Sequence, residues 1–294
     1  MDHAIWACPV CYSDLAAQGD TIRCVSENRF FSRLQGLPVL VRPEQQFLLR
    51  DAQSYASAWK QTKWAPHAEE ILELPFVRRS GWRQKAQSFR ELLEILGSSH
   101  NRNLVDVGAG TGWLSFRLAQ TGFLCFAIDI SSDSEVGLGA ATQFDASPNR
   151  FERALATLDR WPIHSHSVDI AICNASLHYL ADFRLAIAEA ARVLRSSGQF
   201  IIMNSPVHQD SESARRAAKN FRNDIRRLGA SGEVVESHQH LVASDLEDSL
   251  RDRFVDVVRH DLRHQIWFKA ARRLKSLAVG IQFASFPTYV ARAP

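Results

Sequence analysis

Residues 103–130 constrain the fold more than any other part of the chain. They begin with a short apolar strand, residues 104–107, and continue through a glycine-rich turn, residues 108–112, into a helical run. Apolar side chains of that run can share one face: Leu114, Phe116, Leu118 and Ala119. A second apolar strand, residues 123–128, follows and ends at Asp129. Strand, glycine turn, helix, strand and terminal acid in this order predict a nucleotide-binding βαβ unit.

The glycine spacing and the acids indicate which nucleotide this unit binds. In a dinucleotide-binding turn that starts at Gly108, the third glycine would stand where this chain has Trp113. The third glycine comes one residue earlier, at Gly112, and Asp106 precedes the first. An acid at this point would repel a pyrophosphate, whereas it suits the ammonium and sulfonium charges of S-adenosylmethionine. Asp129 can accept hydrogen bonds from both ribose hydroxyls. A turn that merely joins a strand to a helix would not need these acids.

The motif also resembles that of a known family. Asp106-Val107-Gly108-Ala109-Gly110-Thr111-Gly112 is similar to the first motif of the class I S-adenosylmethionine-dependent methyltransferases. The resemblance covers residues 80–294 and is strongest to a small-molecule branch that includes quinone-biosynthesis methyltransferases. It continues through Trp161-Pro162-Ile163, Asp169 and residues 175–180. It implies an α/β fold with a Rossmann-like sheet and helices on both faces.

The resemblance also implies a set of cofactor-binding residues: Asp106, Gly108, Ala109, Gly110, Gly112, Asp129, Ile130, Thr157, Leu158, Asp159, Asn174 and Ala175. One position departs from the family pattern. The family commonly has an adenine-binding aspartate five residues before the proline of this region, where this chain has Thr157. The nearest acid is Asp159. Either the loop is shifted, or backbone groups and Thr157 hold the adenine.

Residues 174–179 would face the transferred methyl group, and they lack the Asn-Pro-Pro-Tyr pattern of amide and amine methylation. His178 is the candidate general base, although a histidine there can instead pack over the cofactor as a structural group. The expected acceptor contacts are aromatic or polar and come from two regions: Tyr55, Trp59, Trp64, His178 and Tyr179. Their character favours a small, ring-containing methyl acceptor.

The first 43 residues resemble the zinc-ribbon-like modules of the Trm112 type, which also precede the methyltransferase core in some ribosomal-RNA guanine methyltransferases. Cys8, Cys11 and Cys24 would be zinc ligands, and Glu27 stands at the spacing of the fourth. Asn28 stands at the alternative spacing and is a poor ligand. The other interpretation is a degenerate ribbon that has lost its metal and packs on the main domain.

The sequence pattern divides the chain into a ribbon-like module (1–43), a helical lid or linker (44–100) and a methyltransferase domain (101–294) with a helical insertion near 211–228. Basic residues recur at helical spacing in that insertion: Arg215, Lys219, Arg222 and Arg226. Such a stripe could contact RNA phosphates, but it is more often a solvated helix face. Two alternatives to a small-molecule enzyme therefore stay open: an RNA base methyltransferase that uses the ribbon and this helix, and an inactive methyltransferase-like binding protein.

Composition fits a globular enzyme. The net charge of +3 is too small to imply nucleic acid by itself, and 46% of the 294 residues are hydrophobic. No apolar run approaches the ~20 residues of a membrane span. The five cysteines suit a reducing compartment, and residues 1–6 lack the pattern of a signal peptide, so we expect a cytoplasmic protein.

Overall fold

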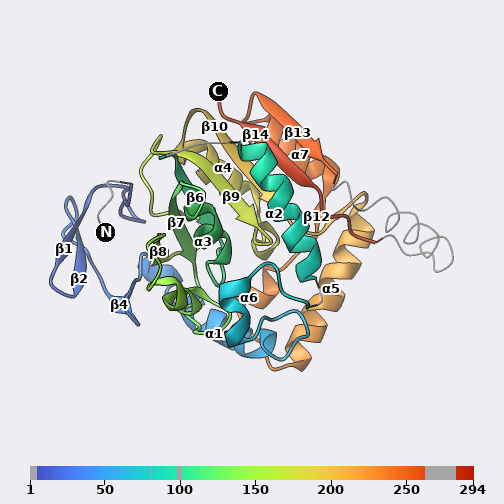
Figure 1. Cartoon of the computed structure of the whole chain (residues 1–294), viewed down its shortest axis with the longest axis horizontal. Coiled ribbons are helices and arrows are strands. Elements are labelled where there is room, and N and C mark those ends of the chain that lie inside the picture. The colour runs from blue at the N-terminus through green and yellow to red at the C-terminus, as the bar shows by residue number, and fades with distance from the viewer. Residues whose placement is uncertain (1–4, 80, 98–100, 262–282) are drawn as a thin grey trace.

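A seven-stranded sheet forms the centre of the protein in a computed structural model that describes residues 5–79, 81–97, 101–261 and 283–294 (Figure 1). The strand order is β13-β14-β10-β9-β6-β7-β8. The strands are β6 (Asn103–Val107), β7 (Leu124–Asp129), β8 (Glu152–Leu155), β9 (Val168–Asn174), β10 (Leu194–Met203), β13 (Asp256–His260) and β14 (Thr288–Arg292). The pairings from β10 through β8 are parallel, and β14 runs antiparallel to both neighbours.

Helices cover both faces of the sheet because its buried strands are apolar on both sides. Leu104 and Ile170 pack on one side with α2 (Trp82–Leu96), α3 (Trp113–Ala119) and the 3₁₀ segment η3 (Leu138–Phe144). Val105 and Ala171, the next residue in each strand, pack on the other side with α4 (Arg184–Val193) and α7 (Ala243–Arg251). The predicted Rossmann-like α/β fold is thereby confirmed.

A further layer lies over the loops that follow β7 and β9. It contains η1 (Pro43–Gln45), α1 (Leu48–Trp59), η2 (Ala68–Glu73), η4 (Leu177–Tyr179), β11 (Val207–His208), α5 (Ser211–Arg227), α6 (Glu233–Glu236) and β12 (Leu241–Val242). Lys60, which follows α1, pairs with Asp133 at 3.0 Å and Glu135 at 3.3 Å after β7. The Tyr55 hydroxyl lies 2.6 Å from that of Tyr179 after β9. The α1 helix therefore covers the carboxyl edge of the sheet.

The N-terminal segment forms a small β unit at one side of the sheet (Figure 1). Its strands are β1 (Leu15–Gln18), β2 (Thr21–Cys24), β3 (Phe30–Phe31), β4 (Arg33–Leu34) and β5 (Leu37–Pro38). The apolar run of residues 36–41 does not form one strand, because only Leu37–Pro38 pairs with β4. Val39 instead forms a parallel bridge to Leu155 at the end of β8.

Buried residues of this unit belong to the same hydrophobic cluster as one face of the central sheet. Arg160 donates to the carbonyls of Pro9 at 2.7 Å and Val10 at 2.6 Å. The Tyr12 ring lies 3.8 Å from the guanidinium carbon of Arg160 and 3.7 Å from that of Arg192. The unit is thus packed tightly on the sheet. None of the helices in the described part of the chain has the length and hydropathy of a membrane span.

Candidate functional site

The order of the strands reverses between β6 and β9, which are neighbours in the sheet although β7 and β8 come between them in the chain. Ligands of open α/β sheets bind at such a point, outside the carboxyl ends of the strands. Two segments leave the sheet there. One is the glycine turn after β6, and the other is residues 174–179 after β9.

The glycine turn is held against the neighbouring strand and leaves open space at its centre. The backbone N–H groups of Gly108 and Ala109 donate to the Ile128 carbonyl at 2.8 and 3.0 Å. A Cβ at Gly108 would collide with Ser176, and one at Gly112 would come within 2.8 Å of Phe151. Gly110, at φ +54°, is different, because the nearest atom to a Cβ there would be the Val136 carbonyl oxygen at 3.7 Å. This space is where a ligand can approach the backbone.

Asp106 is buried at the end of β6 with half of its carboxylate unsatisfied. Ser115 on α3 donates to Oδ2 at 2.9 Å, whereas Oδ1 has no hydrogen-bond partner among the described residues. Burial, with a smaller contribution from the charge of Asp129, raises the pKa of Asp106 to about 7. A buried carboxylate oxygen without a donor is costly, so a cationic ligand group that donates to it would be bound strongly.

Asp129 ends β7 and is oriented by two backbone donors. Gly110 N–H donates to Oδ2 and Ser131 N–H donates to Oδ1, both at 2.8 Å. Burial raises the pKa of Asp129, and these bonds oppose the shift. Each carboxylate oxygen keeps acceptor capacity beyond its backbone bond, as a ribose diol requires. The neighbouring Ile130 is partly buried against the α2 and α3 side of the sheet.

Polar residues at the ends of β9 and β10 are joined to α2. Asn204 donates through Nδ2 to the Asn174 side-chain oxygen at 2.8 Å, and its own oxygen accepts from Ser88 at 2.8 Å. Ala175 and Asn204 have positive φ angles of 57° and 56°. Backbone strain of this kind in residues other than glycine often accompanies binding sites. Ala175 is also held by its N–H bond to the Met203 carbonyl at 2.8 Å.

His178 is buried in η4, and its Nδ1 lies 3.2 Å from the Ser205 hydroxyl. Burial, together with the charges of His240 and Lys85, lowers the pKa of His178 to about 3. The imidazole is therefore neutral at ordinary pH and a weak base. His238 packs edge-on against it, with ring centroids 5.1 Å apart. These contacts suit a residue that shapes the acceptor space.

The aromatic residues predicted as acceptor contacts form one row. Tyr55 stacks on Trp59, and Trp59 stacks on Trp64, each pair with centroids 6.0 Å apart. Tyr55 also meets Tyr179 edge-on at 5.5 Å. Burial raises the pKa of Tyr179 to about 12, and Asp129 adds to this shift. The row thus begins beside Asp129, while Trp64 at its other end is 42% exposed.

The predicted adenine-side residues follow β8. Thr157 is buried, and its hydroxyl lies 3.4 Å from the Gln45 side-chain oxygen. The Asp159 carboxylate accepts from Arg42 and Gln45, both at 2.9 Å. Leu158 packs partly buried against the sheet. The Asp159 carboxylate is thus already engaged by the segment that leads into α1.

Sequence reasoning missed the residues that support this site from other segments. Ser115, Asn204 and Ser205 are among them, and the last two form a polar pair directly after the apolar end of β10. That position could have been recognised, because it is another carboxyl end in the same sheet. Lys85 was also missed, although it interrupts the apolar stripe of α2 between Trp82 and Phe89.

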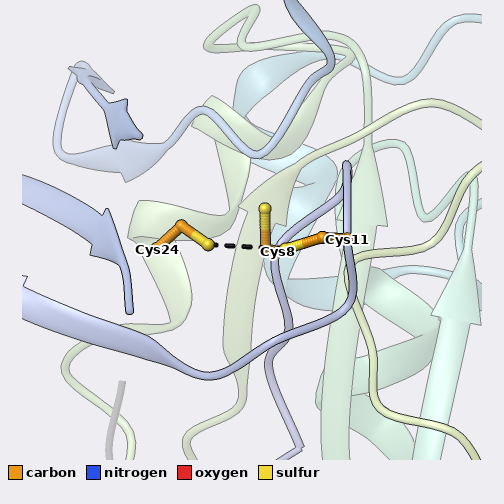
Figure 2. Close-up of side chains that lie close together, drawn as sticks. All are labelled: Cys8, Cys11 and Cys24. Atoms are coloured by element: carbon orange, nitrogen blue, oxygen red, sulfur yellow. Dashed lines mark hydrogen bonds between the residues drawn. The ribbon is translucent and has the colours of Figure 1, made fainter. Parts of the chain in front are cut away.

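The three N-terminal cysteines lie together, outside the site at the sheet edge (Figure 2). The sulfurs of Cys8, Cys11 and Cys24 all lie within 4.8 Å of one another. Glu27 does not join them, and its carboxylate pairs with Arg29 at 3.3 Å. The Ser26 hydroxyl lies 3.3 Å from the Cys11 sulfur instead. The donor chemistry suits zinc, but the described neighbours provide no fourth strong protein ligand.

Comparison with known proteins agrees with the fold and the glycine turn. Residues 105–202 match a family model described as a methyltransferase domain. An uncharacterized chloroplastic methyltransferase of Arabidopsis thaliana is 27% identical over 226 residues, which are 67% of this chain and 60% of that protein. The malonyl-[acyl-carrier protein] O-methyltransferase of Hahella chejuensis is 35% identical over 112 residues, 34% of this chain and 35% of that protein. The matches therefore span only part of these relatives.

A solved structure shows the same fold over more of the chain. The phosphoethanolamine N-methyltransferase 2 of Haemonchus contortus, in complex with phosphomonomethylethanolamine and S-adenosylhomocysteine, has a TM-score of 0.58 at 14% identity. The likeness covers 82% of this chain and 60% of that one. At this identity it shows the fold alone. The chain thus contains a segment that matches a methyltransferase domain, on a fold that it shares with this solved structure.

Proposed function

We propose that the protein transfers the methyl group of S-adenosylmethionine to a small-molecule acceptor at the carboxyl edge of β6 and β9. The observation that carries this proposal is the pair of acids around the open space at Gly110. Asp106 keeps a buried oxygen to which no described residue donates, and Asp129 presents a carboxylate fixed by two backbone bonds. These groups fit the ammonium and the ribose of the cofactor.

Bound S-adenosylmethionine would supply a methyl group that its sulfonium already activates. The chain then has to hold the acceptor in line and exclude water. Residues 174–179 and the aromatic row from Tyr55 to Trp64 are the groups we assign to the acceptor. His178 positions the acceptor and is a poor proton acceptor because its pKa lies far below its ordinary value.

The alternative of an RNA base methyltransferase has less support. Two of the four basic residues of the α5 stripe are engaged within the protein, since Arg226 pairs with Glu236 and Arg222 donates to the His238 carbonyl at 2.6 Å. One solved structure of the same fold, the phosphoethanolamine N-methyltransferase 2 of Haemonchus contortus, holds a small molecule, phosphomonomethylethanolamine. The N-terminal unit serves, in this proposal, as a packed support for the sheet edge and does not carry the methyl chemistry. Its three cysteines supply three thiolate ligands, one fewer than a closed structural zinc site has.

The experiment is methyl transfer from labelled S-adenosylmethionine into a cell extract divided into small-molecule and RNA fractions. We expect label in the small-molecule fraction with the wild type and none with Asp129→Ala. An Asp248→Ala variant is the matched control, because that carboxylate is exposed on α7 and pairs with Arg251. Label confined to RNA, lost steeply as salt rises, would refute the small-molecule acceptor.

A further inference from the structure

Lys85 places a positive charge inside the candidate site. Its ammonium lies 4.2 Å from the ring centroid of Trp82 on the same helix. Trp82 in turn packs edge-on against Trp113 at 6.0 Å, and Trp113 directly follows the glycine turn. One helical turn beyond Lys85, Ser88 donates to the Asn204 side chain, which itself donates to Asn174 at the end of β9. Lys85 therefore lies between the glycine turn and the residues after β9.

No carboxylate of the described residues pairs with this ammonium, whose side chain is partly buried. Desolvation by burial lowers the pKa of Lys85 to about 8. Lys60 provides the contrast, because it pairs with Asp133 and Glu135 and its pKa is raised. A desolvated ammonium is unfavourable unless a negative group approaches it. The missing partner would most simply be an oxyanion of a ligand.

The position of Lys85 indicates which ligand carries that oxyanion. The unsatisfied acid Asp106 is suited to a cationic group of the cofactor, and its pKa reflects burial, Ser115 and Asp129. Lys85 instead lies one helical turn before Ser88, which reaches Asn174, the first residue of the segment assigned to the acceptor, through Asn204. Positive and negative groups are thus separated along the site. The cofactor would then present a positive group to Asp106, and the acceptor would present a negative group to Lys85.

We propose that Lys85 binds a carboxylate or phosphate group of the methyl acceptor, so that the acceptor is an acidic molecule. The flat face of Trp82 beside the ammonium would support an apolar part of the same molecule. This inference rests on the proposed function and names the substrate class of the same site. Lys85 is a binding residue in it, with no part in proton transfer.

The test uses the full chain saturated with S-adenosylhomocysteine and titrated with inorganic phosphate, benzoate and the uncharged benzamide. We expect phosphate or benzoate to bind at least tenfold more weakly to Lys85→Met than to the wild type, and Lys85→Arg to retain binding. Benzamide should bind to the wild type and to each variant with the same affinity. Arg83→Met, which removes an exposed cation of the same helix, is the matched control and should behave as the wild type. Equal anion affinity in the wild type and Lys85→Met, or no anion binding by the wild type, would overturn the proposal.

A second arm identifies the source of the oxyanion. S-adenosylhomocysteine carries a carboxylate, whereas 5′-methylthioadenosine lacks it. We expect Lys85→Met to bind both as the wild type does. Selective loss of S-adenosylhomocysteine binding would assign the oxyanion to the cofactor and overturn the acceptor assignment. A wild type that binds neither compound would contradict the methyltransferase proposal itself, which keeps the two failures distinct.

Discussion

Asp106→Asn removes the negative charge of this side chain while nearly keeping its shape, and it should change how ligand binding depends on pH. In the folded protein without ligand, the pKa of Asp106 is about 7, raised chiefly by burial. At pH 7 the carboxyl group is therefore about half protonated. A ligand ammonium that donates to Oδ1 favours the ionised form, so binding should release about half a proton per ligand at this pH.

The pKa of Asp106 also sets how strongly the affinity changes with pH. Below pH 7 the affinity for S-adenosylhomocysteine should fall by up to about tenfold per pH unit, and above pH 7 it should level off. In Asp106→Asn the charge-assisted bond is lost, which corresponds to about 1.5–3 kcal/mol of binding free energy at higher pH. The amide can still accept from the Ser115 hydroxyl, which lies 2.9 Å from Oδ2 in the wild type. The variant should therefore fold normally and bind without proton release.

Calorimetric titration in buffers of different ionisation enthalpy measures the number of protons released. 5′-Methylthioadenosine, which has no ammonium, is the control ligand and should release none. The reasoning would be refuted if the wild type and Asp106→Asn released the same number of protons with S-adenosylhomocysteine. Equal proton release by the two ligands in the wild type would also refute it.

Three further variants or measurements test other parts of the site. Gly110→Ala should weaken S-adenosylhomocysteine binding more than tenfold by entering the open space, while its φ of +54° costs about 1 kcal/mol of stability, measured by denaturation; unchanged affinity would contradict this placement. His178→Asn should lower kcat/KM but leave the pH profile of kcat/KM unchanged near 6.5, the ordinary histidine pKa. A transition near pH 6.5 in the wild type alone would instead show that His178 acts as a base. Metal analysis should find less than one zinc per chain, and chelator should leave the melting temperature unchanged; one tightly held zinc would show that a non-protein or unforeseen fourth ligand completes the cysteine cluster.

The βαβ unit could be predicted because its signals are local. Apolar runs, three glycines and an acid at the end of each strand correspond directly to β6, α3 and β7. The helical periodicity of residues 83–96 likewise predicts α2. Each of these signals lies within a single strand, turn or helix. The fold class follows from their succession.

Residues that depend on distant partners could not be predicted in the same way. The apolar run of residues 36–41 changes partner after Pro38, and Val39 joins Leu155, more than a hundred residues away. Glu27 has the spacing of a zinc ligand, but Arg29 is close enough to pair with its carboxylate. Asn204 reaches Asn174 and Ser88 only because β9, β10 and α2 meet at one edge. Spacing rules describe a motif in isolation, whereas these contacts are decided by the assembled sheet.

Asp106 and Lys85 lack an oppositely charged partner among the described residues, and this lowers the free energy of unfolding. The effect gives a last test of Lys85. Its pKa falls from 10.5 to about 8 on folding, which corresponds to about 3 kcal/mol of lost stability. Because the folded pKa is the lower one, the unfolded chain binds the proton more readily between these values. The loss is therefore complete below about pH 8 and is relieved as the pH rises toward 10.5.

Lys85→Met should consequently increase the free energy of unfolding at pH 7, measured in denaturant without ligand, and reduce its rise between pH 8 and 10.5. Arg83→Met, on the exposed side of the same helix, should do neither. A destabilised Lys85→Met with an unchanged pH profile would mean that the ammonium is already compensated in the folded chain. A stabilised variant that has lost anion binding would instead show that stability is sacrificed at this position for recognition of a ligand.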